Sequence, residues 1–223
     1  MIIPKKQSSL YDEYAVTIDT GFNKGQSIFP FGAYQFIKRF YDIMFALIGL
    51  IFAFPILMTF CLAIKLETPG SAFFYQERVG LNGRYFRVIK LRSMGIHAEK
   101  NGAQWAEKND PRVTKVGAFI RKTRIDEIPQ LINVLKGDMS LVGPRPERPM
   151  FTAQFNEEIP GFVQRLAVKP GITGWAQVNG GYDITPKEKL ELDMEYIRKQ
   201  SIRFDLKILL YTVKVVLTGN GAR

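Results

Sequence analysis

One segment dominates the hydrophobic pattern of the chain: residues 43–64, IMFALIGLIFAFPILMTFCLAI, contain no charged side chain. As a straight helix this segment would reach roughly 33 Å, which matches the hydrocarbon core of a bilayer. A buried core helix is the alternative, but a segment that is apolar on every helical face is more typical of a membrane helix. The pattern therefore predicts a membrane helix at this place.

Pro55 lies near the middle of this segment, where it removes a backbone donor and kinks or breaks a helix. Cations flank both ends, with Lys38 and Arg39 before the segment and Lys65 after it, so positive charge assigns no orientation. A re-entrant helix that enters the membrane, breaks at Pro55 and returns to the same face satisfies both observations. A kinked helix that spans the membrane is the competing interpretation.

The membrane segment divides the chain into three parts. Residues 1–35 show no sustained hydrophobic period and contain several glycines and prolines, which predicts an extended or loosely packed N-terminal arm. We do not expect a secretory signal, because the apolar run comes late and lacks a small-residue cleavage site. Residues 36–66 are expected to form the re-entrant membrane segment, and residues 67–223 a mixed α+β domain.

Beyond the membrane segment, short strand-like and helix-like patterns follow one another, which indicates an α+β fold. Two apolar stretches joined by Leu81-Asn82-Gly83 predict a β-hairpin. The apolar segment 204–218 carries Lys207 and Lys214 and predicts a final helix on the membrane surface. The other expected helices are 113–121, 126–135 ending at Gly137, 151–158 and 186–200, and the expected loops are 95–110, 137–149 and 169–181.

The charge balance indicates an anionic partner. The 223 residues include 31 Lys and Arg against 21 Asp and Glu, giving a formal net charge of +10. This excess favours nucleic acid, a phosphorylated substrate or an anionic membrane leaflet, although a merely solvated basic surface explains the charge about equally well. The 46% of hydrophobic residues excludes a chain that is disordered throughout.

Cysteine and histidine are almost absent, which narrows the available chemistry. With Cys61 as the single cysteine, no intramolecular disulfide can form. With His97 as the single histidine, a Cys/His zinc site is nearly excluded and a Ser-His-Asp triad would depend on His97 alone. Any catalysis therefore relies on Asp, Glu, Lys, Arg and a metal ion.

The stretch RKTRIDEIPQL places two carboxylates, Asp126 and Glu127, directly after a cluster of cations. Taken alone, Asp126 is better explained as the N-cap of a helix, with Glu127 complementing the helix dipole. The preceding Arg121 and Arg124 favour a second explanation, in which cations hold phosphate groups against the carboxylates. One carboxylate could then bind a divalent metal while the other attacks phosphorus.

The stretch GPRPERP is a second candidate cluster. Prolines on both sides stiffen the loop around Arg145, whose guanidinium suits bidentate phosphate binding. Glu147 could bind a metal or a ribose hydroxyl. A structural Arg–Glu pair is the alternative, and only the joint occurrence with the Asp-Glu pair favours function.

Two more clusters carry weaker signals. Lys90 and Arg92 would share one face of a strand, where they could meet a phosphate or lipid headgroups, although a solvated edge strand is common. In PGITGWAQVNGG the glycines permit close approach to a ligand, and Gln177 and Asn179 could bind a polar head. A glycine-rich turn is the alternative there.

Together, the stretches QERVGLNGRYFRVIKLRSM, DPRVTKVGAFIRKTRIDEIPQLINVLKGDMSLVGPRPERP and VKPGITGWAQVNGG resemble the bacterial sugar transferase family, the monotopic phosphoglycosyl transferases. The resemblance extends from about Phe36 to Val216 and rests on several long motifs in a fixed order. It implies an α+β monotopic membrane protein, with a re-entrant helix, interfacial amphipathic helices and a small catalytic domain on the cytoplasmic face of the inner membrane.

The resemblance also implies a reaction. A sugar-1-phosphate would move from a UDP-sugar to undecaprenyl (polyprenol) phosphate with release of UMP, as the first membrane step of capsule, exopolysaccharide or O-antigen synthesis. Asp126 would be the nucleophile that forms a covalent phosphosugar intermediate, and Glu127 would be associated with Mg²⁺. The implied substrate contacts are Lys90, Arg92, Arg112, Arg121, Arg145, Pro146 and Glu147.

The chain departs from the family pattern at three places. Phe54 precedes Pro55 where the family often has serine, so no hydroxyl lies next to the expected break. Asn179-Gly180-Gly181 replaces a frequent Asn-Gly-Arg, which removes one cation. Leu91 replaces a frequent phenylalanine between Lys90 and Arg92.

The expected partners are all anionic: the UDP-sugar, the polyprenol phosphate and the lipids of the inner leaflet. This agrees with the net charge. A nucleic-acid-binding protein is disfavoured by the hydrophobic run and by the absence of a recognisable reader motif. A non-catalytic membrane adaptor is the remaining competitor, and it leaves the Asp126-Glu127 pair unexplained. The sequence leaves open the sugar, the glycan pathway and a homodimer.

Overall fold

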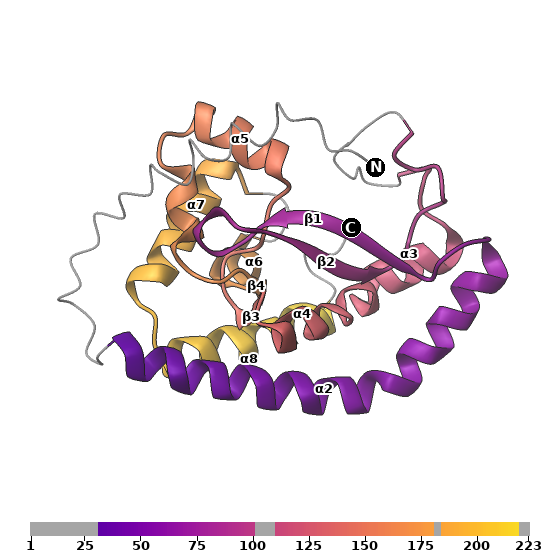
Figure 1. Ribbon diagram of the computed structural model, residues 1–223, viewed down its shortest axis with the longest axis horizontal. Coiled ribbons are helices and arrows are strands. Elements are labelled where there is room, and N and C mark those ends of the chain that lie inside the picture. The colour runs from indigo at the N-terminus through magenta and orange to yellow at the C-terminus, as the bar shows by residue number, and fades with distance from the viewer. Residues whose placement is uncertain (1–30, 101–109, 181–183, 219–223) are drawn as a thin grey trace.

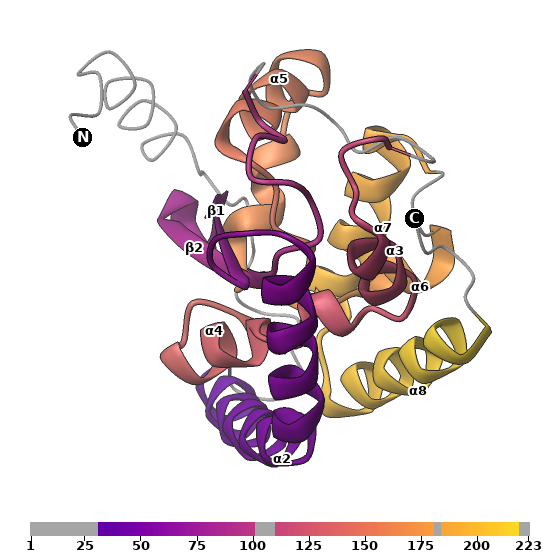
Figure 2. The same ribbon diagram turned by 90° about the vertical axis from the view of Figure 1, so that its right-hand side faces the viewer.

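The computed structural model describes residues 31–100, 110–180 and 184–218, and its longest element is helix α2, Phe31–Glu67 (Figure 1). The helix runs along one side of the molecule and its C-terminal end curves toward α3 and the start of β1 (Figures 1 and 2). It begins directly after Pro30, so residues 31–35 belong to the helix and not to the expected arm. The rest of the arm, residues 1–30, lies outside the described residues.

Two small sheets and several helices form the remaining domain (Figure 1). Strand β1 (Phe73–Val79) pairs antiparallel with β2 (Tyr85–Leu91), and β3 (Ser140–Val142) pairs in parallel with β4 (Gly171–Thr173). The other helices are α3 (Lys115–Lys122), α4 (Gln130–Lys136), α5 (Pro149–Glu158), α6 (Trp175–Gly180), α7 (Pro186–Arg198) and α8 (Ile202–Thr218), with 3₁₀ segments η1 (Leu81–Gly83), η2 (Ile125–Glu127) and η3 (Phe162–Ala167).

This arrangement confirms the α+β class and most expected elements. The hairpin turn lies at Leu81–Gly83, where Asn82 and Gly83 have φ of 53° and 77°, values that suit these two residue types. The predicted helix end at Gly137 is confirmed by its left-handed φ of 90°. The loops expected at 137–149 and 169–181 are partly wrong, because they contain β3, β4 and α6.

Helix α2 is apolar and largely uncovered by the rest of the described protein. Phe36, Phe52 and Leu66 are 76–78% exposed, whereas Ala46 and Ile64 are buried against the domain. The helix is long and apolar enough to cross a membrane. Because each Å² of apolar surface left in water costs about 25 cal/mol, this exposure supports membrane association.

Pro55 lies inside α2 and does not end it. A proline within a helix removes one hydrogen bond and its ring crowds the carbonyl four residues earlier, which is the ordinary cause of a bend in a continuous helix. Thr59 Oγ1 donates to the Pro55 carbonyl at 2.9 Å, so the hydroxyl that binds near the proline follows it in sequence. The structure therefore has one bent helix where the sequence predicted a broken one.

The N-terminal half of α2 is fixed to the domain by buried polar contacts. Lys38 Nζ donates to Asp205 Oδ2 of α8 at 2.6 Å. Asp42 Oδ1 accepts from Ser140 Oγ at 3.1 Å and from the Leu141 amide at 3.0 Å, which joins α2 to β3. Buried polar groups need such partners, so these contacts fix the position of the helix against the domain.

Both ends of α2 also complete the termini of other helices. Arg39 Nη1 donates to the Val134 carbonyl at 2.6 Å, which satisfies part of the C-terminal end of α4. At the other end of α2, the Glu67 carboxylate accepts from the amides of Lys115 and Val116, at 2.7 and 3.1 Å, in the first turn of α3. The helix is thus attached at both ends to the same domain.

A buried side chain of helix α4 hydrogen-bonds to the edge of β2. Asn133 Oδ1 accepts from the Ile89 amide at 3.0 Å, and its Nδ2 donates to the Arg87 carbonyl at 2.8 Å. This amide replaces the next strand of the ladder and so positions α4 against β2. The segment before α4 is thereby held close to the side chains of β2.

Close packing of backbone accompanies the β3–β4 pair. A Cβ added to Gly143 would lie 2.4 Å from the Lys169 carbonyl oxygen, and one added to Gly171 would lie 2.1 Å from the Gly143 nitrogen. Only glycine fits at these two positions. Their contact places the loop after β3 beside the start of α6, which brings the predicted second and fourth clusters together.

Candidate active site

Asp126 and Glu127 lie in η2, between α3 and α4. Arg124, just before η2, has a left-handed φ of 59°, which turns the chain sharply after α3. Helix α4 starts only at Gln130, with Pro129 at its N-cap position. The N-cap explanation for Asp126 is therefore wrong, because a separate 3₁₀ turn carries the two carboxylates.

Glu127 is buried at 8% exposure and is surrounded by cations. Lys90 Nζ from β2 donates to its Oε1 at 2.8 Å, and Arg145 Nη2 from the loop after β3 donates to the same oxygen at 2.5 Å. Arg124 Nη1 lies 3.9 Å from Oε2. Three clusters that are separate in the sequence thus meet at one carboxylate.

The two adjacent carboxyl groups differ in their tendency to hold a proton. Burial alone would raise the pKa of Glu127, but Arg145 and Lys90 outweigh it and hold that pKa well below the usual range. Burial, together with the charge of Glu127, raises the pKa of Asp126 to about 6 despite the nearby cations. Among the described residues, no side chain is seen to donate to the Asp126 carboxylate.

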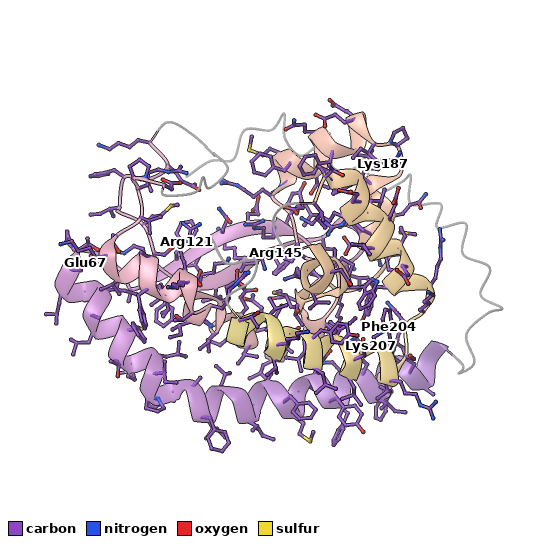
Figure 3. The ribbon with its side chains drawn as sticks, turned by 180° about the vertical axis from the view of Figure 1, so that it is seen from behind. Glu67, Arg121, Arg145, Lys187, Phe204 and Lys207 are labelled. Carbon is purple, nitrogen blue, oxygen red and sulfur yellow. The ribbon has the colours of Figure 1, made fainter. Side chains whose placement is uncertain are left out.

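Both carboxylates line a cleft of about 970 Å³, which is large enough for a nucleotide-sized ligand. Figure 3 shows Arg121 of α3 and Arg145 in the central region of the domain, on the side of α8 away from α2. The basic residues of the cleft wall are Lys90, Arg92, Arg112, Arg121, Arg124, Arg145, Arg148 and Lys189, with Arg78 at one end. The positive charge of this lining attracts anions.

Arg145 is held from behind by a buried ion pair. Arg165 Nη2 donates to the Arg145 carbonyl at 2.8 Å and also to Asp193 Oδ2 of α7 at 2.6 Å. The Arg165 and Asp193 side chains are 2% and 1% exposed and do not line the cleft. Burial raises the pKa of Asp193, and the paired Arg165 acts against that increase. This pair fixes the loop that carries Arg145.

Glu147 lies in the cleft wall and is also paired. Its carboxylate accepts from Lys189 Nζ of α7 and lies 3.7 Å from Arg78 Nη1 of β1. Burial would raise the pKa of Glu147, but Lys189, Arg165 and Arg78 together hold it below the usual range. The structure therefore keeps Glu147 ionised at one end of the cleft.

Arg92 and Arg112 line the cleft but use their guanidinium groups for structural contacts. Arg92 Nη1 and Nη2 donate to the carbonyls of Pro69 and Thr68, at 2.5 and 2.9 Å, and so complete the end of α2. Arg112 pairs with Asp110, with Nε at 2.8 Å from Oδ1. Their predicted phosphate contacts would have to compete with these bonds.

Arg121 differs from these two arginines. It lines the cleft, contributes to the field at Asp126, and shows no hydrogen bond or ion pair with the other described residues. It is therefore the cleft cation best placed to take an anionic ligand without first losing a protein partner.

Of three further predicted site residues, Gln177 lies in the cleft wall and Pro146 and Asn179 do not. Gln177 lines the cleft, and its Nε2 donates to the Ile172 carbonyl at 2.9 Å. Pro146 and Asn179 are not among the residues that line the cleft. The Pro146 carbonyl accepts from Arg78, and Asn179 Nδ2 donates to the Trp175 carbonyl at 2.7 Å, so neither side chain is brought to Asp126. Gly181 lies outside the described residues.

Sequence reasoning missed four residues that hold the site in place: Asn133, Arg165, Asp193 and Lys189. Arg165, Asp193 and Lys189 lie outside the quoted motifs, Asn133 lies inside one of them, and the partners of all four are distant in the chain. A local pattern contains no signal for such pairs. Their polar contacts in the folded domain identify them.

Known proteins resemble this chain over most of its length. The family model for bacterial sugar transferases matches residues 33–219. A UDP-N-acetylgalactosamine-undecaprenyl-phosphate N-acetylgalactosaminephosphotransferase from Aeromonas hydrophila is 48% identical over 90% of this chain and 48% of its own length. The galactosyl transferase CpsE of Streptococcus agalactiae is 46% identical over 83% of this chain and 43% of its own.

A relative of more similar length is the UDP-glucose:undecaprenyl-phosphate glucose-1-phosphate transferase of Caulobacter vibrioides, 43% identical over 83% of this chain and 71% of its own length. The chain spans about half the length of the Aeromonas relative. The names of these relatives share a transferase activity and differ in the sugar. On the match to residues 33–219 and these identities, the chain belongs to the bacterial sugar transferase family.

Proposed function

We propose that this protein transfers a sugar-1-phosphate from a UDP-sugar to undecaprenyl phosphate with release of UMP, through a covalent intermediate on Asp126. The names of the relatives support the acceptor and the type of donor. One observation carries the proposal: Asp126 has no donor among the described residues and faces a cationic cleft, while its neighbour Glu127 is neutralised by Lys90 and Arg145.

The reaction would proceed in two displacements at one carboxylate. In the first, an Asp126 oxygen attacks the phosphorus that carries the sugar, and the bond to the bridging oxygen breaks with its electron pair leaving on UMP. In the second, a phosphate oxygen of the acceptor attacks the same phosphorus and releases the Asp126 carboxylate. Arg121, Arg145 and Lys90 would offset the negative charge that the donor brings to Asp126.

The donor set fits a divalent cation that arrives with the substrate. Asp126 and Glu127 are adjacent carboxylates in the cleft, and no group of three or more His, Cys, Asp or Glu that could hold a metal ion is found in the described part of the chain. Mg²⁺ commonly binds one or two carboxylates and takes its other ligands from phosphates and water. Glu127 would hold Mg²⁺ by exchanging contacts with Lys90 and Arg145 for the ion, and the ion would supply charge neutralisation at the diphosphate.

The contacts of α2 support a re-entrant placement in the membrane. Lys38 near its start and Glu67 at its end both bind the same domain, although a spanning helix would carry its ends to opposite sides. We place this domain on the cytoplasmic face of the inner membrane, where nucleotide sugars are available. Lys207 and Lys214 of α8 would face the anionic leaflet. Tags at residues 32 and 69 that label from opposite sides would refute this placement.

The proposed reaction is tested by UMP release from purified protein in nanodiscs with Mg²⁺ and undecaprenyl phosphate. A panel of UDP-sugars should begin with UDP-N-acetylgalactosamine, because the Aeromonas relative carries that sugar in its name. We expect release with one donor, and radiolabel from that donor on the protein when acceptor is omitted. Asp126→Asn should lose both signals. Equal release by the wild type and this variant would exclude Asp126 as the nucleophile.

A further inference from the structure

The cleft that contains Asp126 changes character along its length. Around Asp126 its wall is basic, with Lys90, Arg121 and Arg145. Toward α4 and α8 the wall becomes apolar, and the residues that line it there are Ile128, Leu131, Ile172, Val215 and Val216. A ligand that fills the whole cleft would therefore need an anionic end and an apolar end.

The apolar lining starts next to the candidate nucleophile. Ile128 is two residues from Asp126, and Leu131 follows it at the helical spacing that places both on one side. Leu131 also reaches the membrane helix, since a Cβ on Gly49 of α2 would lie 3.1 Å from Leu131 Cδ1. The apolar end of the cleft therefore extends from the reactive carboxylate toward α2.

The opposite wall belongs to α8 and leads to its uncovered apolar face. Val215 and Val216 line the cleft, and Val216 is also 47% exposed at the surface. Leu210 and Val213 continue this exposed apolar face along α8. The apolar end of the cleft thus opens at the face by which α8 would contact the membrane.

The two threonine hydroxyl groups in this wall, those of Thr173 and Thr212, are hydrogen-bonded within the protein. Thr212 Oγ1 donates to the Ile208 carbonyl at 2.8 Å, so the 2.7 Å contact between Thr173 and Thr212 needs Thr173 as its donor. Both hydroxyl hydrogens are then committed within the protein. The wall consequently offers few donors to a ligand and keeps its apolar character.

We propose that this apolar passage, lined by Ile128, Leu131, Ile172, Val215 and Val216, binds the first isoprene units of a polyprenyl phosphate acceptor, with the phosphate at Arg121 beside Asp126. The inference rests on the proposed function for the identity of the lipid. A UDP-sugar has no apolar body to cover these walls. The donor would occupy the other end of the cleft, where Glu147 and Lys189 line the wall together with Phe151 and Phe155.

The first test narrows the passage without touching a charged residue. Val215→Trp should raise the acceptor KM about tenfold or more. Val213→Trp is the matched control, because Val213 lies on the same helix, is 56% exposed and does not line the cleft. Equal effects of the two variants on acceptor KM, or no effect of Val215→Trp, would overturn the proposal.

A second test reads binding without turnover. In a Cys61→Ser background, Val215→Cys in nanodiscs is labelled with a maleimide in the presence of decaprenyl phosphate, decaprenol or phosphatidylglycerol, with Val213→Cys as the control. We expect decaprenyl phosphate to slow labelling at 215 and not at 213, and decaprenol to protect less. Equal protection by phosphatidylglycerol would assign the passage to bulk lipid and overturn the proposal.

These readouts also separate the two proposals. A wild-type protein that releases no UMP with any donor, but whose Val215→Cys variant is protected by decaprenyl phosphate, would refute the reaction and retain the lipid passage. UMP release by the wild type, together with a Val215→Cys variant that decaprenyl phosphate does not protect, would retain the reaction and refute the lipid passage.

Discussion

The Asp126–Glu127 pair in η2 and the Arg165–Asp193 pair between η3 and α7 both place buried carboxylates against arginine. At Glu127 several cations meet one carboxylate, and the neighbouring Asp126 is left facing the cleft. At Asp193 a single arginine meets a single carboxylate, and neither side chain lines the cleft. Burial of charge is thus common to both sites, and access to the cleft is the property that distinguishes a candidate for chemistry from a structural pair.

The largest effect is expected at the Arg165–Asp193 pair, which does not line the cleft. Asp193→Asn should lower the free energy of unfolding by about 3–5 kcal/mol, because it leaves the Arg165 guanidinium buried without its counter-charge. Urea unfolding in detergent, followed by tryptophan fluorescence, measures this loss. If stability stays unchanged while UMP release disappears, Asp193 takes part in the chemistry and the distinction between the sites fails.

Asp126→Asn should have the opposite effect on stability. The folded protein raises the Asp126 pKa from 3.8 to about 6, so the fold disfavours the ionised carboxylate by about 3 kcal/mol above pH 7. We expect a higher Tm for the variant, with a gain that grows as the pH rises through about 6. Glu127→Gln is the control, and it should lower the Tm because Lys90 and Arg145 lose their partner. A lower Tm for Asp126→Asn would show that its carboxylate stabilises the fold.

The pH dependence of the first displacement tests the raised pKa of Asp126 in a second way. In the proposed reaction Asp126 would attack in its ionised form, so the rate of acceptor-free UMP formation should be constant above pH 7 and fall through about pH 6, by roughly tenfold between pH 7 and pH 5. Rapid-quench measurement of UMP formation checks this expectation. A rate that rises as the pH falls would indicate that Asp126 acts as an acid.

The smallest expected effect comes from a residue outside both pairs. Thr114 Oγ1 accepts from the Gly117 amide at 2.9 Å and caps α3, the helix that leads to η2. Thr114→Ala should cost about 1 kcal/mol of stability, because the cap is lost, and should leave the pH profile of UMP formation unchanged. Chemical unfolding and the same rapid-quench measurement check both parts. A shifted pH profile would mean that the start of α3 controls the field at Asp126.

The sequence predicted those features whose cause is local. The apolar run of α2, the turn at Asn82-Gly83 and the helix end at Gly137 each depend on neighbouring residues, and the structure contains all three. The strands β3 and β4 were missed because each has only three residues and is defined by its partner. Their pairing depends on the close approach of Gly143 and Gly171, which no periodicity records.

In the candidate site, too, features with a local cause were predicted and those that depend on distant residues were not. Asp126, Glu127, Lys90 and Arg145 were identified from their motifs, and the structure brings them together. The use of Arg92 and Arg112 for structural contacts could not be predicted, since it depends on where the end of α2 and Asp110 lie in space. The position of Asn179 away from the cleft was equally inaccessible, because a residue's motif does not fix its direction.

The double attachment of α2 has a mechanical consequence. A domain joined to a buried rod at one point could pivot about it, and the height of its cleft above the bilayer would vary with every swing. Contacts at Lys38 and at Glu67, near the two ends of α2, prevent the domain from rotating about a single attachment point. Together with the link from Arg39 to the end of α4, they would hold the Asp126 carboxylate at one fixed distance from the lipid surface in the membrane placement proposed above.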